Sequence, residues 1–421
     1  MKRVLFIGAA ESSHTAGWIN LLENSNIDYA LFALPTGGLP ASKLIPTYMS
    51  DHRARRGASG FNLLNLKLSK LISLFFLTYL LSFTRLFLRL LKAVGRIFSI
   101  NMTFFNYEAY PEYLLSYQLK SFIRTFNPNV VHTLGIFPSS TLFLAVAQEF
   151  PDVRWVAQAR GGPDLELNIL HFQREELIRQ IFLKADIIVC DSEVNYSLAQ
   201  SLGADPIKFK LGVVPGSGGL DFEQYTSSLV HHSDERLVVW PKVYEAISSK
   251  AAPVFEAIKI AWEDIKPVSF VFLWLEDGEL DLWLRKTLSP EILASIKILK
   301  RVSHVDAMRE ISKARVLLAP SLMDGIPNVM LESMMLGAVP IVSPIPTISS
   351  FVSDPENVIF ARNLYPEEIA HALVRALNDE DGNASRRRAN YDLVRSKYDR
   401  NSIKLQLNVI YEELFQLENF T

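Results

Sequence analysis

Short, mostly apolar runs alternate with amphipathic stretches along the chain. In the first half these runs cover residues 4–7, 29–32, 130–132, 155–157 and 187–189. Helical patterns separate them, for example at residues 112–125 and 173–183. Runs of this length are typical of strands that are buried on both faces of a parallel sheet. The alternation therefore predicts an α/β fold with helices on both faces of the sheet.

A second series of strands begins near residue 237. Its apolar runs cover residues 237–240, 270–273, 296–299, 316–319 and 339–342. A turn-rich segment at 214–219 and a polar stretch at 227–235 separate the two series, which predicts an interdomain linker there. We expect two Rossmann-like, doubly wound domains, residues 1–225 and 236–395. Ligands of such sheets bind beyond the carboxyl ends of the strands. The charged cluster at 379–388 is interpreted as a solvated turn before a final amphipathic helix, residues 396–421.

Composition agrees with a globular protein of more than one domain. The chain has 421 residues, 49% of them hydrophobic, and a formal net charge of -2, which gives no reason to expect nucleic acid as a partner. Its single cysteine, Cys190, fits a reducing compartment. The apolar run at residues 4–10 is too short for an export signal. We therefore expect a cytoplasmic location.

Residues 319–337 are the most informative segment. The pattern predicts a strand, a tight loop, and a short helix from about Asn328 to Leu336 that Gly337 ends. The loop then lies at the carboxyl edge of the sheet, and the N-terminus of the helix offers free N–H groups to an anion. Glu332 follows one turn into the helix, where a carboxylate can accept hydrogen bonds from a vicinal diol such as a ribose.

This segment resembles the donor-binding signature of the family-4 retaining glycosyltransferases, which have the GT-B fold. In that family two glutamates flank seven residues; the second binds the nucleotide ribose and the first contacts the donor sugar. Here Asp324 and Glu332 hold these positions. The resemblance implies GT-B architecture, in which the two domains face each other across a cleft and the C-terminal helix packs back on the first domain. It also implies a UDP- or GDP-linked sugar as donor, bound by Glu332 and the loop residues Gly325, Ile326, Pro327, Asn328 and Val329.

Other positions support the same resemblance. Lys242, just after the first strand of the second domain, and Lys250, eight residues on, resemble the family's basic residues that hold the donor diphosphate. His132 resembles a histidine at the acceptor cleft, although a lone histidine at a strand end serves packing or capping as often. The loop after the first strand contains His14 and Gly17, and we expect Gly17 to contribute to donor binding. Residues 160–163 are interpreted as an ordinary turn.

The resemblance implies retention of the anomeric configuration. Lys242, Lys250 and the backbone N–H groups of the donor loop would stabilise the departing diphosphate electrostatically. Asp324 and His132 complete the expected catalytic set. The sequence gives no pattern that demands a metal and no convincing covalent nucleophile, so we expect front-face displacement without a metal or cofactor.

Residues 61–100 are rich in Leu and Phe. Arg85, Arg89, Lys92 and Arg96 recur along one helical stripe of this segment. Such a basic amphipathic segment is typical of the interface of an anionic leaflet; the alternative is that its apolar side packs on the first sheet. The membrane interpretation predicts a peripheral protein at the inner face of the cell membrane, and a lipid-linked or oligosaccharide acceptor in surface polysaccharide synthesis.

Two other functions remain open. A non-catalytic GT-B binding or scaffold protein would fit the departures from the signature at Asp324 and Lys242. A GT-B sugar-nucleotide epimerase would use the same donor site, but its substrate would not need a membrane-binding segment.

Overall fold

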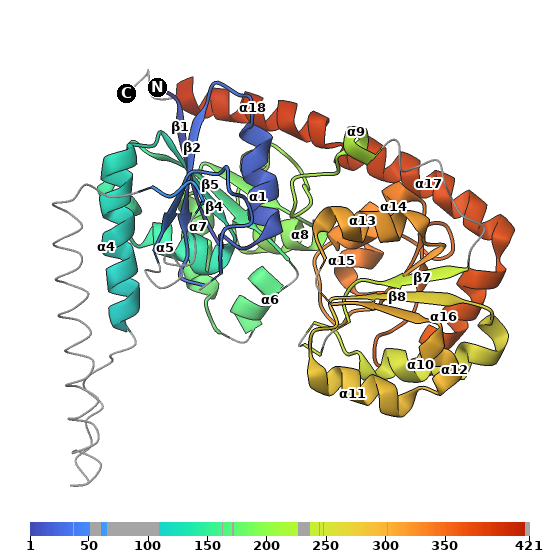
Figure 1. Cartoon of the computed structure of the whole chain (residues 1–421). Coiled ribbons are helices and arrows are strands. Elements are labelled where there is room, and N and C mark those ends of the chain that lie inside the picture. The colour runs from blue at the N-terminus through green and yellow to red at the C-terminus, as the bar shows by residue number, and fades with distance from the viewer. Residues whose placement is uncertain are drawn as a thin grey trace, which may run out of the picture.

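The computed structural model describes residues 1–36, 38–50, 60–64, 109–161, 163–170, 172–225, 236–243, 245–246, 248–300 and 302–416. Within these ranges the chain forms two α/β domains, each built on a six-stranded sheet (Figure 1). The expected linker at 227–235 and nearly all of the expected basic segment at 61–100 lie outside the described residues.

The first sheet has the strand order β3-β2-β1-β4-β5-β6, and all of its strands are parallel. This is the doubly wound order, whose topological switch point lies between β1 and β4. The short edge strand β3 was not predicted from the sequence. The strands are β1 (Arg3–Gly8), β2 (Asp28–Ala33), β3 (Thr47–Met49), β4 (Val130–Leu134), β5 (Arg154–Ala159) and β6 (Ile187–Cys190).

Helices cover both faces of the first sheet because its strands bury apolar side chains on both sides. One face, with Leu5 and Ile7, packs on α4, α5 and α7. The other face, with Val4 and Phe6, packs on α1 and on the distant C-terminal helix α18. The helices of this domain are α1 (Ser13–Ile19), α4 (Ala109–Phe126), α5 (Thr141–Leu144), α6 (Pro163–Leu170), α7 (Glu175–Lys184), α8 (Glu193–Ser201) and α9 (Phe222–Tyr225).

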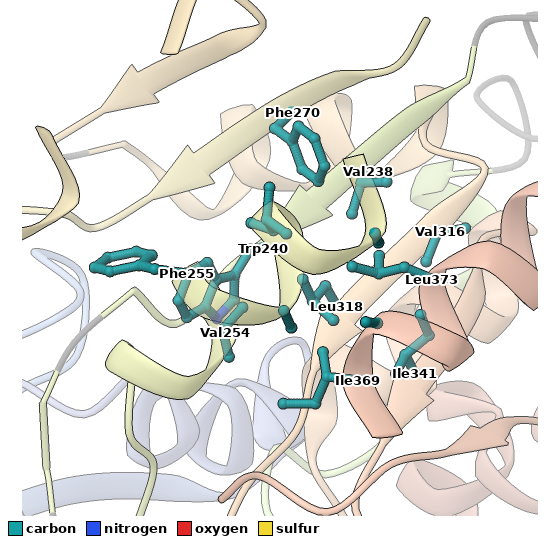
Figure 2. Packing of buried hydrophobic residues seen from close by; sticks show 14 of the residues in the cluster. Val238, Trp240, Val254, Phe255, Phe270, Val316, Leu318, Ile341, Ile369 and Leu373 are labelled. Carbon is teal, nitrogen blue, oxygen red and sulfur yellow. The ribbon is translucent and has the colours of Figure 1, made fainter. Parts of the chain in front are cut away.

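The second sheet repeats the same winding, in the order β12-β11-β10-β7-β8-β9. Its switch point therefore lies between β7 and β10. Figure 2 shows one side of its core, where Trp240 of β7 packs on Phe255 of α10. The strands are β7 (Leu237–Trp240), β8 (Ser269–Leu273), β9 (Ile296–Leu299), β10 (Val316–Ala319), β11 (Val339–Val342) and β12 (Ile359–Phe360).

The helices of the second domain also lie on both faces of its sheet. The α10 and α16 helices cover the face shown in Figure 2, whereas α13, α14 and α17 cover the other. The helices are α10 (Ala252–Ile265), α11 (Gly278–Thr287), α12 (Pro290–Ala294), α13 (His304–Lys313), α14 (Asn328–Leu336), α15 (Pro346–Ser349), α16 (Pro366–Asn378) and α17 (Glu380–Tyr398).

The prediction of a solvated turn at 379–388 is wrong, because α17 occupies nearly all of it. The Asp379 carboxylate caps this helix by accepting from the Gly382 N–H at 3.0 Å. Arg386 is buried and donates to the same carboxylate at 3.0 Å. The charges thus satisfy one another within the fold instead of marking a loop.

The chain crosses between the domains a second time after α17. The Leu220 N–H donates to the Tyr398 carbonyl, and the Arg400 N–H donates to the Leu220 carbonyl, so the two crossings pair with each other. Helix α18 (Arg400–Gln416) then lies along the first domain (Figure 1), as predicted for the C-terminal helix. Within the described residues, no helix combines the length and apolar character needed to cross a bilayer.

Gly219 lies where the two crossings meet. Its φ is +95°, and an added Cβ would lie 2.7 Å from Ile403 Cδ1 and 2.9 Å from the Tyr398 carbonyl oxygen. Gly212 has a φ of +62° but no atom within 4 Å of such a Cβ. We expect Gly219→Ala to cost both the left-handed backbone strain, about 1–2 kcal/mol, and an overlap of about 1–3 kcal/mol. Gly212→Ala should carry the strain alone. Thermal unfolding measures the difference, and equal Tm values for the two variants would contradict this description of the crossing.

Candidate active site

A cleft of about 1010 Å³ opens between the two domains at the carboxyl edges of both sheets. The loop after β1 lines it from the first domain, and the loops after β7, β8 and β10 line it from the second. The interdomain turn at 216–219 and Arg400 close one side. Because β1 and β7 flank the switch points of their sheets, the two expected ligand positions face each other across one space.

The loop after β10 leads directly into α14. Pro327 is the N-cap of this helix, and Gly337 ends it with a φ of 86°, as predicted. The first N–H groups of a helix have no carbonyl partner inside it. Residues 324–329 and Glu332 all line the cleft. The positive end of α14 is therefore presented to the cleft together with the predicted donor residues.

Glu332 contacts a histidine that the sequence did not bring to notice. The Glu332 carboxylate bonds to His304 Nε2 at 2.7 Å, and only 14% of its side chain is exposed. This hydrogen bond, supported by the charge of Glu332, raises the pKa of His304 above its ordinary value. His304 begins α13, and both residues line the cleft.

Asp324 and Lys242 form an ion pair in the same cleft. Lys242 Nζ donates to Asp324 Oδ2 at 2.6 Å, and Asp324 Oδ1 accepts from the Gly325 N–H at 3.0 Å. Both side chains are largely shielded from solvent, since 30% of the Lys242 side chain and 25% of the Asp324 side chain are exposed. The sequence placed both residues in the donor site, and the structure brings them together across the ends of β7 and β10.

Lys250 is not among the residues that line the cleft, and its contact with the diphosphate stays a prediction. Its ammonium lies 3.5 Å from the Glu245 carboxylate. Its backbone is instead bonded twice to the Asn363 amide, at 2.9 and 3.1 Å. The same amide donates to the Pro320 carbonyl at 3.0 Å. Lys250 therefore belongs to a loop that supports the β10 loop from behind.

The expectation that His132 lies at the acceptor cleft is wrong. It is completely buried on the face of the first sheet that α18 covers, and it does not line the cleft. Its Nδ1 bonds to the Tyr411 hydroxyl at 2.6 Å, and its ring packs on Phe6 and Trp18. Burial, followed by the charge of Arg160, lowers the pKa of His132 to about 3. Its role is to pack and hold α18, which was the alternative that the sequence left open.

Gly17 lines the cleft, as expected, and the reason for a glycine is visible. A Cβ at this position would lie 2.6 Å from the Ser217 carbonyl oxygen. The Gly17 and Ser217 carbonyls both accept from the Arg400 guanidinium. Helix α1, the interdomain turn and the start of α18 are thus joined at one edge of the cleft.

The loop at residues 160–163 is more than an ordinary turn. A Cβ on Gly325 of the second domain would lie 2.7 Å from Asp191 Oδ2 and 3.1 Å from the Gly161 Cα. Asp191 in turn accepts from the Gly161 N–H. Its pKa is raised, chiefly by burial. The donor loop therefore lies directly against the first domain.

Two ionisable side chains, Asp164 and Arg160, hold the loops of the first domain next to this contact. The Asp164 carboxylate accepts from the backbone N–H groups of Ile136, Phe137 and Arg160, at 2.8, 3.1 and 2.9 Å. Burial raises its pKa to about 6 in spite of these bonds. The Arg160 guanidinium donates to the Gly216 carbonyl at 2.6 Å, which ties the β5 loop to the interdomain turn.

Comparisons with known proteins agree with this architecture. Residues 254–379 match the family model described as glycosyl transferases group 1, a range that includes the donor loop, Glu332 and His304. No curated protein sequence matches the chain. Residues 254–379 are therefore similar to group 1 glycosyltransferases, and the whole chain has the GT-B fold.

Solved structures show the same fold over the whole chain. Sucrose-phosphate synthase from Thermosynechococcus elongatus is 13% identical, with a TM-score of 0.66 over 99% of this chain and 100% of that one. Anabaena HepE in complex with UDP-glucose is 9% identical, with a TM-score of 0.64 over 98% of this chain and 100% of that one. A glycosyltransferase from Rickettsia africae is 11% identical, with a TM-score of 0.64 over 98% of both chains. At these identities the likeness concerns the GT-B fold alone.

Gly325 gives a test of the contact between the two GT-B domains. We expect Gly325→Ala to separate the donor loop from Gly161 and Asp191, because the new Cβ overlaps both. Overpacking of this kind costs about 1–3 kcal/mol. Hydrogen exchange at the Gly161 amide should become faster, and X-ray scattering should give a larger radius of gyration. Gly278→Ala is the control, since nothing lies within 4 Å of a Cβ there. Exchange as slow as in the control would show that the domains do not meet at Gly325.

Proposed function

We propose that the protein transfers a sugar from a nucleoside diphosphate donor to an acceptor hydroxyl, with retention of the anomeric configuration. The observation that carries the proposal is the position of Glu332, one turn inside a helix whose N-terminus faces the interdomain cleft. A diphosphate suits the free N–H groups and positive end of such a helix. A ribose diol suits a shielded carboxylate beside it.

Each part of the donor has a matching group in the cleft. Glu332 binds the ribose, and His304 holds its carboxylate in place. The N-terminus of α14 and the Lys242 ammonium bind the diphosphate and stabilise the charge that develops as it leaves. Asp324, which holds Lys242 and lies in the middle of the loop, faces the sugar. We propose that transfer proceeds without a metal or a further cofactor.

The retaining step proceeds on one face of the sugar. The bond between the anomeric carbon and the diphosphate oxygen breaks, which leaves an oxocarbenium-like sugar beside the departing diphosphate. The acceptor hydroxyl adds to the same face, and its proton passes to an oxygen of the leaving diphosphate. This route suits a cleft in which most of the groups that bind the diphosphate lie on the second domain and the acceptor enters from the first.

We further propose that the acceptor is lipid-linked, as in surface polysaccharide synthesis, and that the protein binds the inner face of the cell membrane peripherally. The basic amphipathic pattern at 61–100 supports this. A group of exposed apolar side chains on the first domain adds support. Leu170, Phe172 and Phe137 are 74%, 49% and 41% exposed. The Arg174 guanidinium lies 4.8 Å from the centre of the Phe172 ring and 3.7 Å from that of Phe137. Exposed apolar groups beside a cation suit an anionic interface.

The donor site is tested by the affinity for UDP, the nucleotide present in a structure of HepE. We expect Glu332→Ala to weaken UDP binding roughly tenfold to a hundredfold, because hydrogen bonds to a charged group contribute about 1.5–3 kcal/mol. Isothermal titration calorimetry measures the dissociation constant. Glu310→Ala is a matched control, since Glu310 is also 14% exposed, pairs with Lys297, and lies outside the cleft. If both variants lost UDP affinity equally, or if neither lost it, Glu332 would not be a residue of the donor site.

Flotation with liposomes tests the membrane proposal. The protein should float with vesicles that contain phosphatidylglycerol and remain at the bottom with phosphatidylcholine alone. Replacement of Arg85, Arg89, Lys92 and Arg96 by Gln should reduce binding by roughly two orders of magnitude or more, at about 1 kcal/mol for each basic residue. Unchanged flotation of this variant would instead favour packing of the segment on the first sheet.

A further inference from the structure

One polar contact crosses the cleft from the first domain to the helix at the centre of the donor site. His14, the second residue of α1, lies 314 residues from Asn328, the first residue of α14. The Asn328 amide nitrogen lies 2.8 Å from His14 Nδ1 and 3.5 Å from His14 Nε2. Both residues line the cleft.

The Asn328 amide is held on its other side too. Its Oδ1 accepts from the Ser217 hydroxyl at 3.0 Å, and Ser217 belongs to the turn that joins the domains. With the amide oxygen so engaged, its NH₂ group is directed to His14. An amide NH₂ donates only, so the nearer ring nitrogen, Nδ1, accepts. The proton of the neutral imidazole is therefore on Nε2.

The charges around His14 keep its ring neutral. Desolvation between the domains, followed by the positive charge of Arg160, lowers the pKa of His14 to about 4. Within this shift of the pKa, Asp324 acts in the opposite direction, and Lys242 and His304 make smaller contributions that lower it. At neutral pH the ring is thus an uncharged donor with a fixed tautomer. It lies among the same charged groups that line the donor cleft.

We infer that His14 binds the diphosphate of the donor, and that its Nε2–H donates to the outer phosphate. This inference rests on the function proposed above. An anion at the N-terminus of α14 lies next to Asn328, and His14 is already bonded to that side chain. The first domain thereby contributes a donor to the leaving group, so the diphosphate is fully bound only when the two domains are together. Ser217 and Asn328 act as positioning residues, because they orient the ring and do not need to touch the ligand.

The experiment compares UDP with UMP, which lacks the outer phosphate, by calorimetry. We expect His14→Ala to weaken UDP binding roughly tenfold to a hundredfold and to leave UMP binding unchanged. His14→Gln, whose amide reaches the position of Nε2, should restore much of the UDP affinity. His14→Asn, whose amide reaches only the position of Nδ1, keeps the contact with Asn328 and should remain as weak as His14→Ala. His371→Ala, at an exposed histidine of α16 outside the cleft, should bind both nucleotides as the wild type does.

The outcomes separate this inference from the proposed function. Wild-type affinity for UDP in His14→Ala would overturn the role of His14 and leave the donor site intact. An equal loss of UDP and UMP binding would also overturn it, since that result indicates a structural effect on the cleft. If the wild-type protein binds neither UDP nor GDP, the proposed function fails, and the role of His14 fails with it.

Discussion

The close approach of the Gly325 backbone to Gly161 and Asp191 determines how the two sheets face each other. There is no space for a side chain at this point, so the loop after β10 lies directly on the loop after β5. The paired crossings at Leu220 and Tyr398 fix the opposite side. Because both switch points then open into one cleft, residues from loops more than 300 positions apart, such as His14 and Asn328, come within hydrogen-bond distance.

Two pairs of ionisable side chains in this cleft are bonded to each other. Lys242 is bonded to Asp324, and His304 is bonded to Glu332. In a partly desolvated space an unpaired charge is costly, and such pairs keep the residues in place. A diphosphate and a ribose would therefore exchange partners with these groups instead of meeting free ones. The net gain from each contact is smaller than an isolated ion pair suggests, and the backbone N–H groups of α14 gain in relative importance.

The sequence predicted the fold and the donor helix because their signals are local. Buried strands appear in the sequence as apolar runs. Pro327 favours the start of a helix and Gly337 favours its end, so both ends of α14 can be recognised. The errors concern long-range contacts. His132 was expected at the end of a strand, but it lies inside β4, and Tyr411, 279 residues later, covers it. His304, which the sequence did not bring to notice, joins Glu332 from a separate helix. These contacts cannot be predicted from the spacing of residues in the sequence, because they depend on how the domains and α18 pack.

The structure shows how Asp324 differs from the glutamate that is usual at this position of the signature. The Asp324 carboxylate is held by the N–H of the next residue and by Lys242, so it stays close to the backbone of the loop. A glutamate would carry the same charge one methylene farther into the cleft, beyond the reach of the Gly325 N–H. On the proposed function, the shorter side chain leaves more space where the sugar lies and holds the Lys242 ammonium near the helix N-terminus. We therefore propose that Asp324 affects which sugar fits the cleft more than how the diphosphate is bound, because the groups assigned to the diphosphate are present.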